Sequence, residues 1–134
     1  MRATARRHDG TFRQTVQVRI HQVTADEPAS EGGGDSGPSP EELLAASLAS
    51  CSAITMEMYA RRKGWEVGDV EVEVDYEPSQ RGSPTRFGMV VRFPASVPTE
   101  QRERLLTVAA KCPVHRTLEG EVMFEERVEL TGSG

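Results

Sequence analysis

The sequence has few of the residues that most often carry chemistry: its 134 residues include only two cysteines and three histidines. A structural zinc site needs four ligands, and Cys112 and His115 offer one close pair, of C-x-x-H spacing. No second close pair occurs elsewhere, so the sequence predicts no metal site. Any chemistry therefore depends on very few side chains, and the two cysteines are the first candidates.

The chain also lacks a long apolar run and an excess of positive charge. Its basic start is followed by no apolar stretch, so it does not have the pattern of a secretory signal. The uncharged window 43–56 is too short, and too rich in alanine and serine, to span a bilayer. A formal net charge of −5 gives no general attraction for nucleic acid or anionic lipid. These absences predict a cytoplasmic protein, with neither nucleic acid nor a membrane as partner, whose thiols are normally reduced.

The length fits a single domain, residues 1–134, large enough to bury a core. Within it, the Gly-, Ser- and Pro-rich stretch 25–39 predicts a flexible loop, and the last residues, 131–134, predict a frayed tail. Much of the remainder alternates between apolar and polar residues, the pattern of strands with one buried face. We expect strands at 3–8, 12–23, 68–78, 85–95 and 121–130, with a hairpin turn at Asp9-Gly10 after the first.

A long helix is predicted at 40–63, because this stretch carries both start and stop signals. Ser39 and Glu42 form an S-x-x-E capping box, and three cations precede the closing residue, Gly64. The helix is apolar most of the way round, so we expect it to be buried at the centre of the core. Shorter helices are expected at 99–111 and 112–120. The sequence thus predicts an α+β domain of order β-β-α-β-β-α-α-β, with antiparallel strands around a buried helix.

Taken alone, neither cysteine requires a catalytic role. Cys51 has the character of a small hydrophobic residue within the core helix. Cys112 would start a short helix, where the positive end of the dipole favours a thiolate. A hydrolase pair of Cys112 with His115 is geometrically possible, but no oxyanion loop accompanies it. Glu41 is equally explained as a carboxylate that favours the helix dipole.

Two separated motifs, "GPSPEELLAASLASCSAI" and "KCPVHRTLEGEV", resemble the OsmC/Ohr family of osmotically inducible and organic hydroperoxide resistance proteins. The family pattern is a Pro-Glu pair at the start of a central helix and a cysteine ten residues after the glutamate. A Cys-Pro pair follows about sixty residues later. In this chain the pattern falls on Pro40, Glu41, Cys51, Cys112 and Pro113.

The resemblance implies an OsmC-like fold in an intertwined homodimer with active sites at the interface. It also implies a thiol peroxidase for organic hydroperoxides. Cys51 would attack the peroxide and become a sulfenic acid, and Cys112 would resolve it to a disulfide. An external dithiol, dihydrolipoyl groups in the Ohr branch, would restore both thiols. No metal, haem or flavin cofactor is implied.

A buried apolar cysteine has a raised pKa, so a cation has to face Cys51 if it is to react. In the Ohr branch this cation is an arginine near the end of the first strand, held by the motif glutamate. Arg6, Arg7, Arg13 and Arg19 are the candidates here. If none of them serves, the alternative is an OsmC-like redox or small-ligand-binding protein without efficient turnover, and a purely structural dimer is a third possibility.

Glu41 cannot reach Cys51 along one straight helix, since ten residues rise about 15 Å. We therefore expect Glu41 to approach a cysteine of the other chain.

Overall fold

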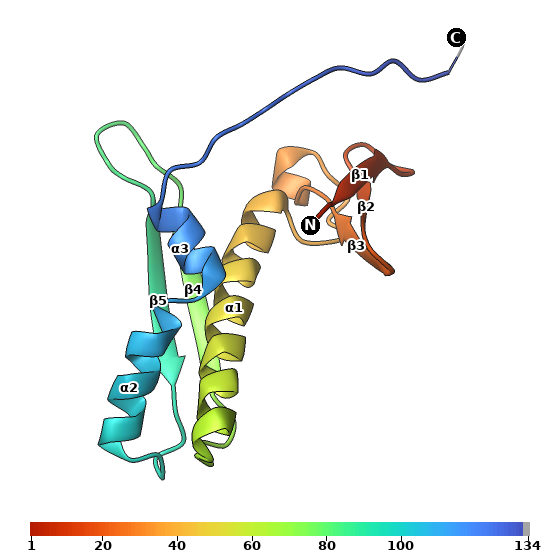
Figure 1. The fold of residues 1–134 in the computed structure, drawn as a ribbon. Coiled ribbons are helices and arrows are strands. Elements are labelled where there is room, and N and C mark those ends of the chain that lie inside the picture. Colours follow the sequence, from red (N-terminus) through yellow and green to blue (C-terminus); the bar gives the residue numbers. More distant parts are fainter. Residues whose placement is uncertain (133–134) are drawn as a thin grey trace.

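The structure of this protein, a computed structural model, describes residues 1–132 and has the α+β architecture that the sequence predicts (Figure 1). It combines antiparallel strands with a central helix, α1. In chain order the elements are β1 (Thr4–Arg7), β2 (Gln14–Val18), β3 (His21–Ala25), a 3-10 helix η1 (Ala29–Glu31), α1 (Pro40–Lys63), β4 (Glu71–Glu77), β5 (Arg86–Arg92), α2 (Thr99–Ala109) and α3 (Pro113–Glu119).

The N-terminal strands form an antiparallel sheet of order β1-β2-β3. The prediction of one strand over 12–23 is wrong, because the chain reverses at Arg19 and Ile20 and splits that stretch into β2 and β3. Arg19 takes a positive φ of 53° there. The turn contains no Gly, Asn or Pro, and the register pairs Val16 with Val23, so the alternation continues through the turn without a break. Periodicity alone could not locate it.

The central helix has the predicted bounds and caps. The Ser39 hydroxyl accepts from the Glu42 amide at 3.2 Å, and the Glu42 carboxylate accepts from the Ser39 amide at 2.9 Å. Gly64 closes the helix in the left-handed conformation, with φ 69°. Local sequence therefore fixed both ends of α1.

The remaining elements of the body cover one side of α1 (Figure 1). The β4–β5 hairpin pairs Val72 with Val91 and Val74 with Met89, so that its alternating apolar residues share a face. This hairpin, α2 and α3 all contact α1. The buried core lies between them and consists of Met56, Ala60, Val67, Val97, Leu105 and Ala109.

The helix lies centrally, as expected, but in the single chain its burial is confined to one side. One stripe is buried, namely Leu48, Ser52, Met56 and Ala60. On the other side Ile54 is 54% exposed and Met58 is 59% exposed. The helix has the length and hydropathy of a membrane-crossing helix, but it packs lengthwise on its own β4, α2 and α3 as a core helix does.

The predicted strand at 121–130 is also wrong for this chain: the segment has no regular secondary structure and leads away from the body (Figure 1). Its apolar side chains are uncovered, with Phe124 at 82% and Leu130 at 95% exposure. Alternation makes a segment suitable for a strand, but a strand also needs a neighbouring edge to bond to. Of the predicted tail, residues 131–132 have no helix or strand, and residues 133–134 lie outside the described part.

The predicted flexible loop, 25–39, has defined internal contacts, although its mobility stays a prediction. The Asp26 carboxylate, 3% exposed, accepts from the Ser36 hydroxyl at 2.6 Å and from the Glu27 amide at 2.8 Å. The bond from Ser36 connects the two ends of the Gly-rich stretch between the N-terminal sheet and α1.

Candidate redox site

Cys112 occupies the N-cap of α3, as the sequence predicts, and Pro113 takes the first helical position. Its Sγ accepts a hydrogen bond from the backbone N–H of His115 at 3.3 Å. Such an N–H is one of the donors that a helix start leaves without a main-chain partner. The cysteine has no exposed surface. Its sulfur is therefore held in a dry position by the first turn of α3.

Cys51 lies in the middle of α1, where α3 packs against it. It is partly exposed, unlike Cys112. The Val114 backbone, from the first turn of α3, the Cys112 side chain and the Thr55 side chain are the neighbours that act on the pKa of its thiol. The fold thus brings together two cysteines that are sixty-one positions apart, 112 − 51, in the sequence.

The pKa of the Cys51 thiol is raised in this chain. Burial is the main cause, and the hydrogen bond and charge of Cys112 add to it, while the Val114 amide and Thr55 act in the opposite direction. Within residues 1–132, no arginine is among the groups that shift this pKa. In the described part of the chain, the groups that shift this pKa include no cation that would favour the thiolate.

The four candidate arginines belong to the N-terminal sheet instead. Arg6 and Arg7 lie in β1, while Arg13 precedes β2 and Arg19 forms its turn to β3. This sheet lies beyond the N-terminal end of α1, away from the middle of that helix (Figure 1). The structure therefore does not bring any of them to Cys51 of the same chain.

Glu41 is likewise separate from the sulfurs. It is exposed in the first turn of α1, where it lines a hollow with Phe12 and Glu27. Because the structure describes one chain, the expected approach of Glu41 to a cysteine of another chain stays a prediction.

A largely apolar hollow of about 360 Å³ lies between α1, the β4–β5 hairpin and α3, and neither cysteine is among the residues that line it. Leu44 and Leu48 line it and lie seven and three residues before Cys51, on the same face of α1. The other walls come from β4, β5 and α3 and include Tyr76, Thr85, Phe87, His115, Leu118 and Glu119. The hollow has the character of a site for a small apolar molecule.

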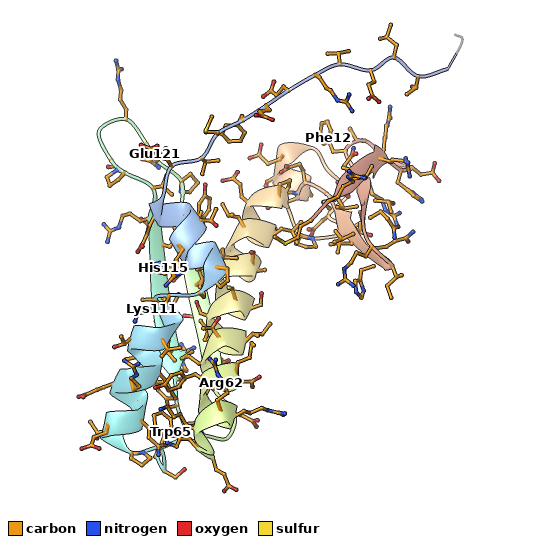
Figure 2. All side chains as sticks on the ribbon, in the orientation of Figure 1. Phe12, Arg62, Trp65, Lys111, His115 and Glu121 are labelled. Carbon is orange, nitrogen blue, oxygen red and sulfur yellow. The ribbon has the colours of Figure 1, made fainter. Side chains whose placement is uncertain are left out.

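The hydrolase pairing of Cys112 with His115 gains no support from the geometry. Figure 2 shows His115 on α3, just beyond Lys111 at the end of α2. Its contact with the sulfur is made by the backbone N–H, whereas its ring Nδ1 lies 3.0 Å from Glu119 Oε1. That approach is not aligned as a hydrogen bond. Among residues 1–132, no three Cys, His, Asp or Glu side chains are grouped as metal ligands.

Sequence reasoning missed Ser52 and Thr55. Ser52 has no exposed surface, and its Oγ lies 3.9 Å from Cys112 Sγ. The signal was present, because Ser52 shares the helical stripe of Leu48, Met56 and Ala60. A polar residue within an apolar stripe needs a partner.

Comparison with models of protein families identifies the family of this chain. The family model described as OsmC-like protein matches residues 32–127, which include both motifs.

The chain belongs to the OsmC family.

Solved structures of other proteins have the same fold as this OsmC-family chain. One is an OsmC-like protein from Mycoplasma pneumoniae, with TM-score 0.72, 22% identity, and coverage of 89% of this chain and 86% of that one. The organic hydroperoxide resistance protein OhrB of Bacillus subtilis has TM-score 0.61 and 23% identity, covering 89% and 90%. An organic hydroperoxide resistance protein from Elizabethkingia anophelis has TM-score 0.62 and 23% identity, covering 88% and 86%. A comparison with curated proteins found no match.

Proposed function

We propose that this OsmC-family protein is a cysteine-based thiol peroxidase that reduces organic hydroperoxides to alcohols. The observation that carries the proposal is the meeting of Cys51 and Cys112 at the start of α3, a helix that also lines the apolar hollow. Structural relatives that are named organic hydroperoxide resistance proteins support the substrate class. The cytoplasm, where donors keep thiols reduced, is the compartment that suits this chemistry.

The reaction divides into three steps. The Cys51 thiolate attacks the peroxide, forming an S–O bond while the O–O bond breaks, and the leaving alkoxide takes a proton to become the alcohol. The Cys112 thiol then condenses with the sulfenic acid, giving a disulfide and water. An external dithiol, of which a dihydrolipoyl group is one kind, reduces the disulfide. Only thiols and the peroxide take part, so the chemistry draws on no resident cofactor.

A homodimer is part of the proposal, because the single chain leaves several apolar surfaces uncovered. These are the outer side of α1, with Ile54 and Met58, and the C-terminal segment 121–130, with Phe124. Contiguous exposed apolar surface of this kind marks an interaction site. A second copy would cover them, and its N-terminal sheet has two open strand edges to which the alternating C-terminal segment can pair.

Charge favours the same arrangement. The C-terminal segment carries four glutamates and one arginine, whereas β1 carries Arg6 and Arg7. A symmetric exchange would lay the acidic segment of each copy near the basic sheet of the other. It would also let the partner's sheet supply the cation that Cys51 lacks and let Glu41 act across the interface.

The second candidate function is an OsmC-like redox or small-ligand-binding protein without efficient turnover. The raised pKa of Cys51, with no arginine among the groups that shift it, favours this reading. A thiol that stays protonated at neutral pH is a poor nucleophile.

Steady-state consumption of cumene hydroperoxide with dithiothreitol as reductant separates the two functions. The peroxidase predicts turnover that Cys51→Ser abolishes. The second function predicts no consumption above that of the reductant alone, with both thiols still titratable. Cys51→Ser turning over like the parent would show that the mechanism is wrong.

A further inference from the structure

Ser52 is a buried hydroxyl that contacts the sulfur of Cys112. It is 0% exposed and follows Cys51 on α1, and its Oγ lies 3.9 Å from Cys112 Sγ. Ser50 on the same helix behaves differently, since its exposed hydroxyl donates to the Ala46 carbonyl at 2.9 Å. Burying a hydroxyl is unfavourable unless it has a hydrogen-bond partner. The sulfur of Cys112 therefore serves as the hydrogen-bond partner that the buried Ser52 hydroxyl needs.

The two sulfurs also differ in access. Cys112 is 0% exposed, whereas Cys51 is partly exposed. In thiol–disulfide exchange, access decides which sulfur is attacked, and the other leaves as a thiolate. The proposed peroxidase requires that Cys51 stays open to the peroxide in the dimer, so a reductant reaches the same sulfur of a disulfide between these two residues, and Cys112 becomes the leaving group.

We propose that Ser52, together with the His115 amide, holds the Cys112 thiolate when it leaves, and so directs the reductant to Cys51. The inference rests on the proposed function for the existence of the disulfide. One thiolate of the dithiol attacks Cys51 Sγ, an S–S bond forms to the reductant, and the Cys51–Cys112 bond breaks with its electrons on Cys112. The second thiol of the reductant then displaces Cys51, and Cys112 takes up a proton.

The position of Cys112 explains why two donors are useful. A thiolate that forms where water has no access must be stabilised by fixed groups. The His115 N–H points at Sγ from 3.3 Å, and the Ser52 hydroxyl can turn its proton to the same atom. Hydrogen bonds to charged groups are stronger than those between neutral groups. Both donors are in place before the exchange begins, so little reorganisation is needed.

The test needs no peroxide. Diamide converts the parent protein to its disulfide form, and reduction by dithiothreitol is followed by stopped flow. We expect Ser52→Ala to slow reduction about tenfold, near the lower limit for losing a hydrogen bond to a charge because the contact is long. Ser50→Ala, the matched control, is expected to reduce at the parent rate. A parent-like rate for Ser52→Ala would overturn the inference.

The Val108→Ala variant tests whether Ser52 acts on the reduction itself or only stabilises the fold. Val108 is a core residue of α2 that is 8% exposed, so its truncation lowers stability, and its apolar side chain donates no hydrogen bond to either sulfur. We expect this variant to lose thermal stability yet reduce at the parent rate. If Val108→Ala slows reduction as much as Ser52→Ala does, the effect is general loosening and the inference fails.

The attacked sulfur can be identified directly. 2-Mercaptoethanol is reacted briefly with the disulfide form, free thiols are blocked at low pH, and peptides are mapped by mass spectrometry. The mixed disulfide is expected on Cys51, and its occurrence on Cys112 would overturn the assignment.

The outcomes also separate this inference from the proposed function. If diamide forms no Cys51–Cys112 disulfide in the parent protein, both this inference and the proposed function are wrong. If the disulfide forms and Ser52→Ala slows its reduction, but the parent protein consumes no hydroperoxide, the proposed function alone is wrong.

Discussion

Phe124 offers the sharpest test of the proposed dimer, because the single chain gives it nothing to pack against. Its side chain is 82% exposed in the C-terminal segment. An aromatic side chain offers about 200 Å² for burial, so about 160 Å² remains to be covered by a partner. At about 25 cal/mol per Å² this is worth about 4 kcal/mol. Alanine retains part of that area, so Phe124→Ala should weaken the dimer by about 3 kcal/mol per copy. A symmetric dimer contains two copies, so the dissociation free energy should fall by about 6 kcal/mol, which is about ten-thousandfold in Kd.

The control is the neighbouring residue. Met123 is 88% exposed in the same segment, but the alternation of a strand would place it on the opposite, outer face. Met123→Ala should change the dissociation free energy by about 0.5 kcal/mol or less. Sedimentation velocity over a range of protein concentrations measures both variants against the parent. A parent that is monomeric at all concentrations, or a Phe124→Ala variant that dimerises as the parent does, would refute the reasoning.

The remaining predictions concern the core, the helix cap and the thiols. Leu105 is fully buried, so Leu105→Ala should lower the free energy of unfolding by about 2–5 kcal/mol. Leu106 is 46% exposed, so Leu106→Ala should lower it far less. Urea unfolding of the two variants measures the difference. Ser39→Ala removes the capping box of α1 and should cost about 1 kcal/mol, which thermal unfolding detects as a lower Tm. Burial and then the Cys112 thiol raise the pKa of Cys51, so its thiolate forms at higher pH than that of an ordinary thiol. In Cys112→Ser the pH midpoint for iodoacetamide alkylation of Cys51 should therefore move down, and an upward shift would contradict the assigned cause.

Local signals in the sequence predicted the helices well. The caps at Ser39 and Gly64 fixed the bounds of α1, and the Cys-Pro start fixed α3. These features depend on hydrogen bonds within a few residues, so a single sequence contains them. The turn at Arg19 was missed because it uses no residue typical of turns.

Features that depend on distant or external contacts were not predictable in the same way. Alternation at 121–130 indicated a strand, but in the single chain the segment pairs with no strand edge and has no regular secondary structure. The apolar character of α1 indicated a buried central helix, and in the single chain one stripe of it is buried. Both differences lie at surfaces that we propose a second copy covers. At the site, the family motifs pointed to Cys51 and Cys112, whereas the contact of Ser52 with Cys112 needs the packing of α1 against α3.

The central claim is that Cys51 and Cys112 form one redox pair, and a single-turnover titration tests it most directly. The reduced protein is mixed with one equivalent of cumene hydroperoxide without any reductant, free thiols are counted, and disulfides are mapped by mass spectrometry. The account predicts the loss of two thiols per chain, one equivalent of cumyl alcohol, and a disulfide between Cys51 and Cys112. Retention of both thiols, or equal consumption of peroxide by Cys51→Ser, would contradict it.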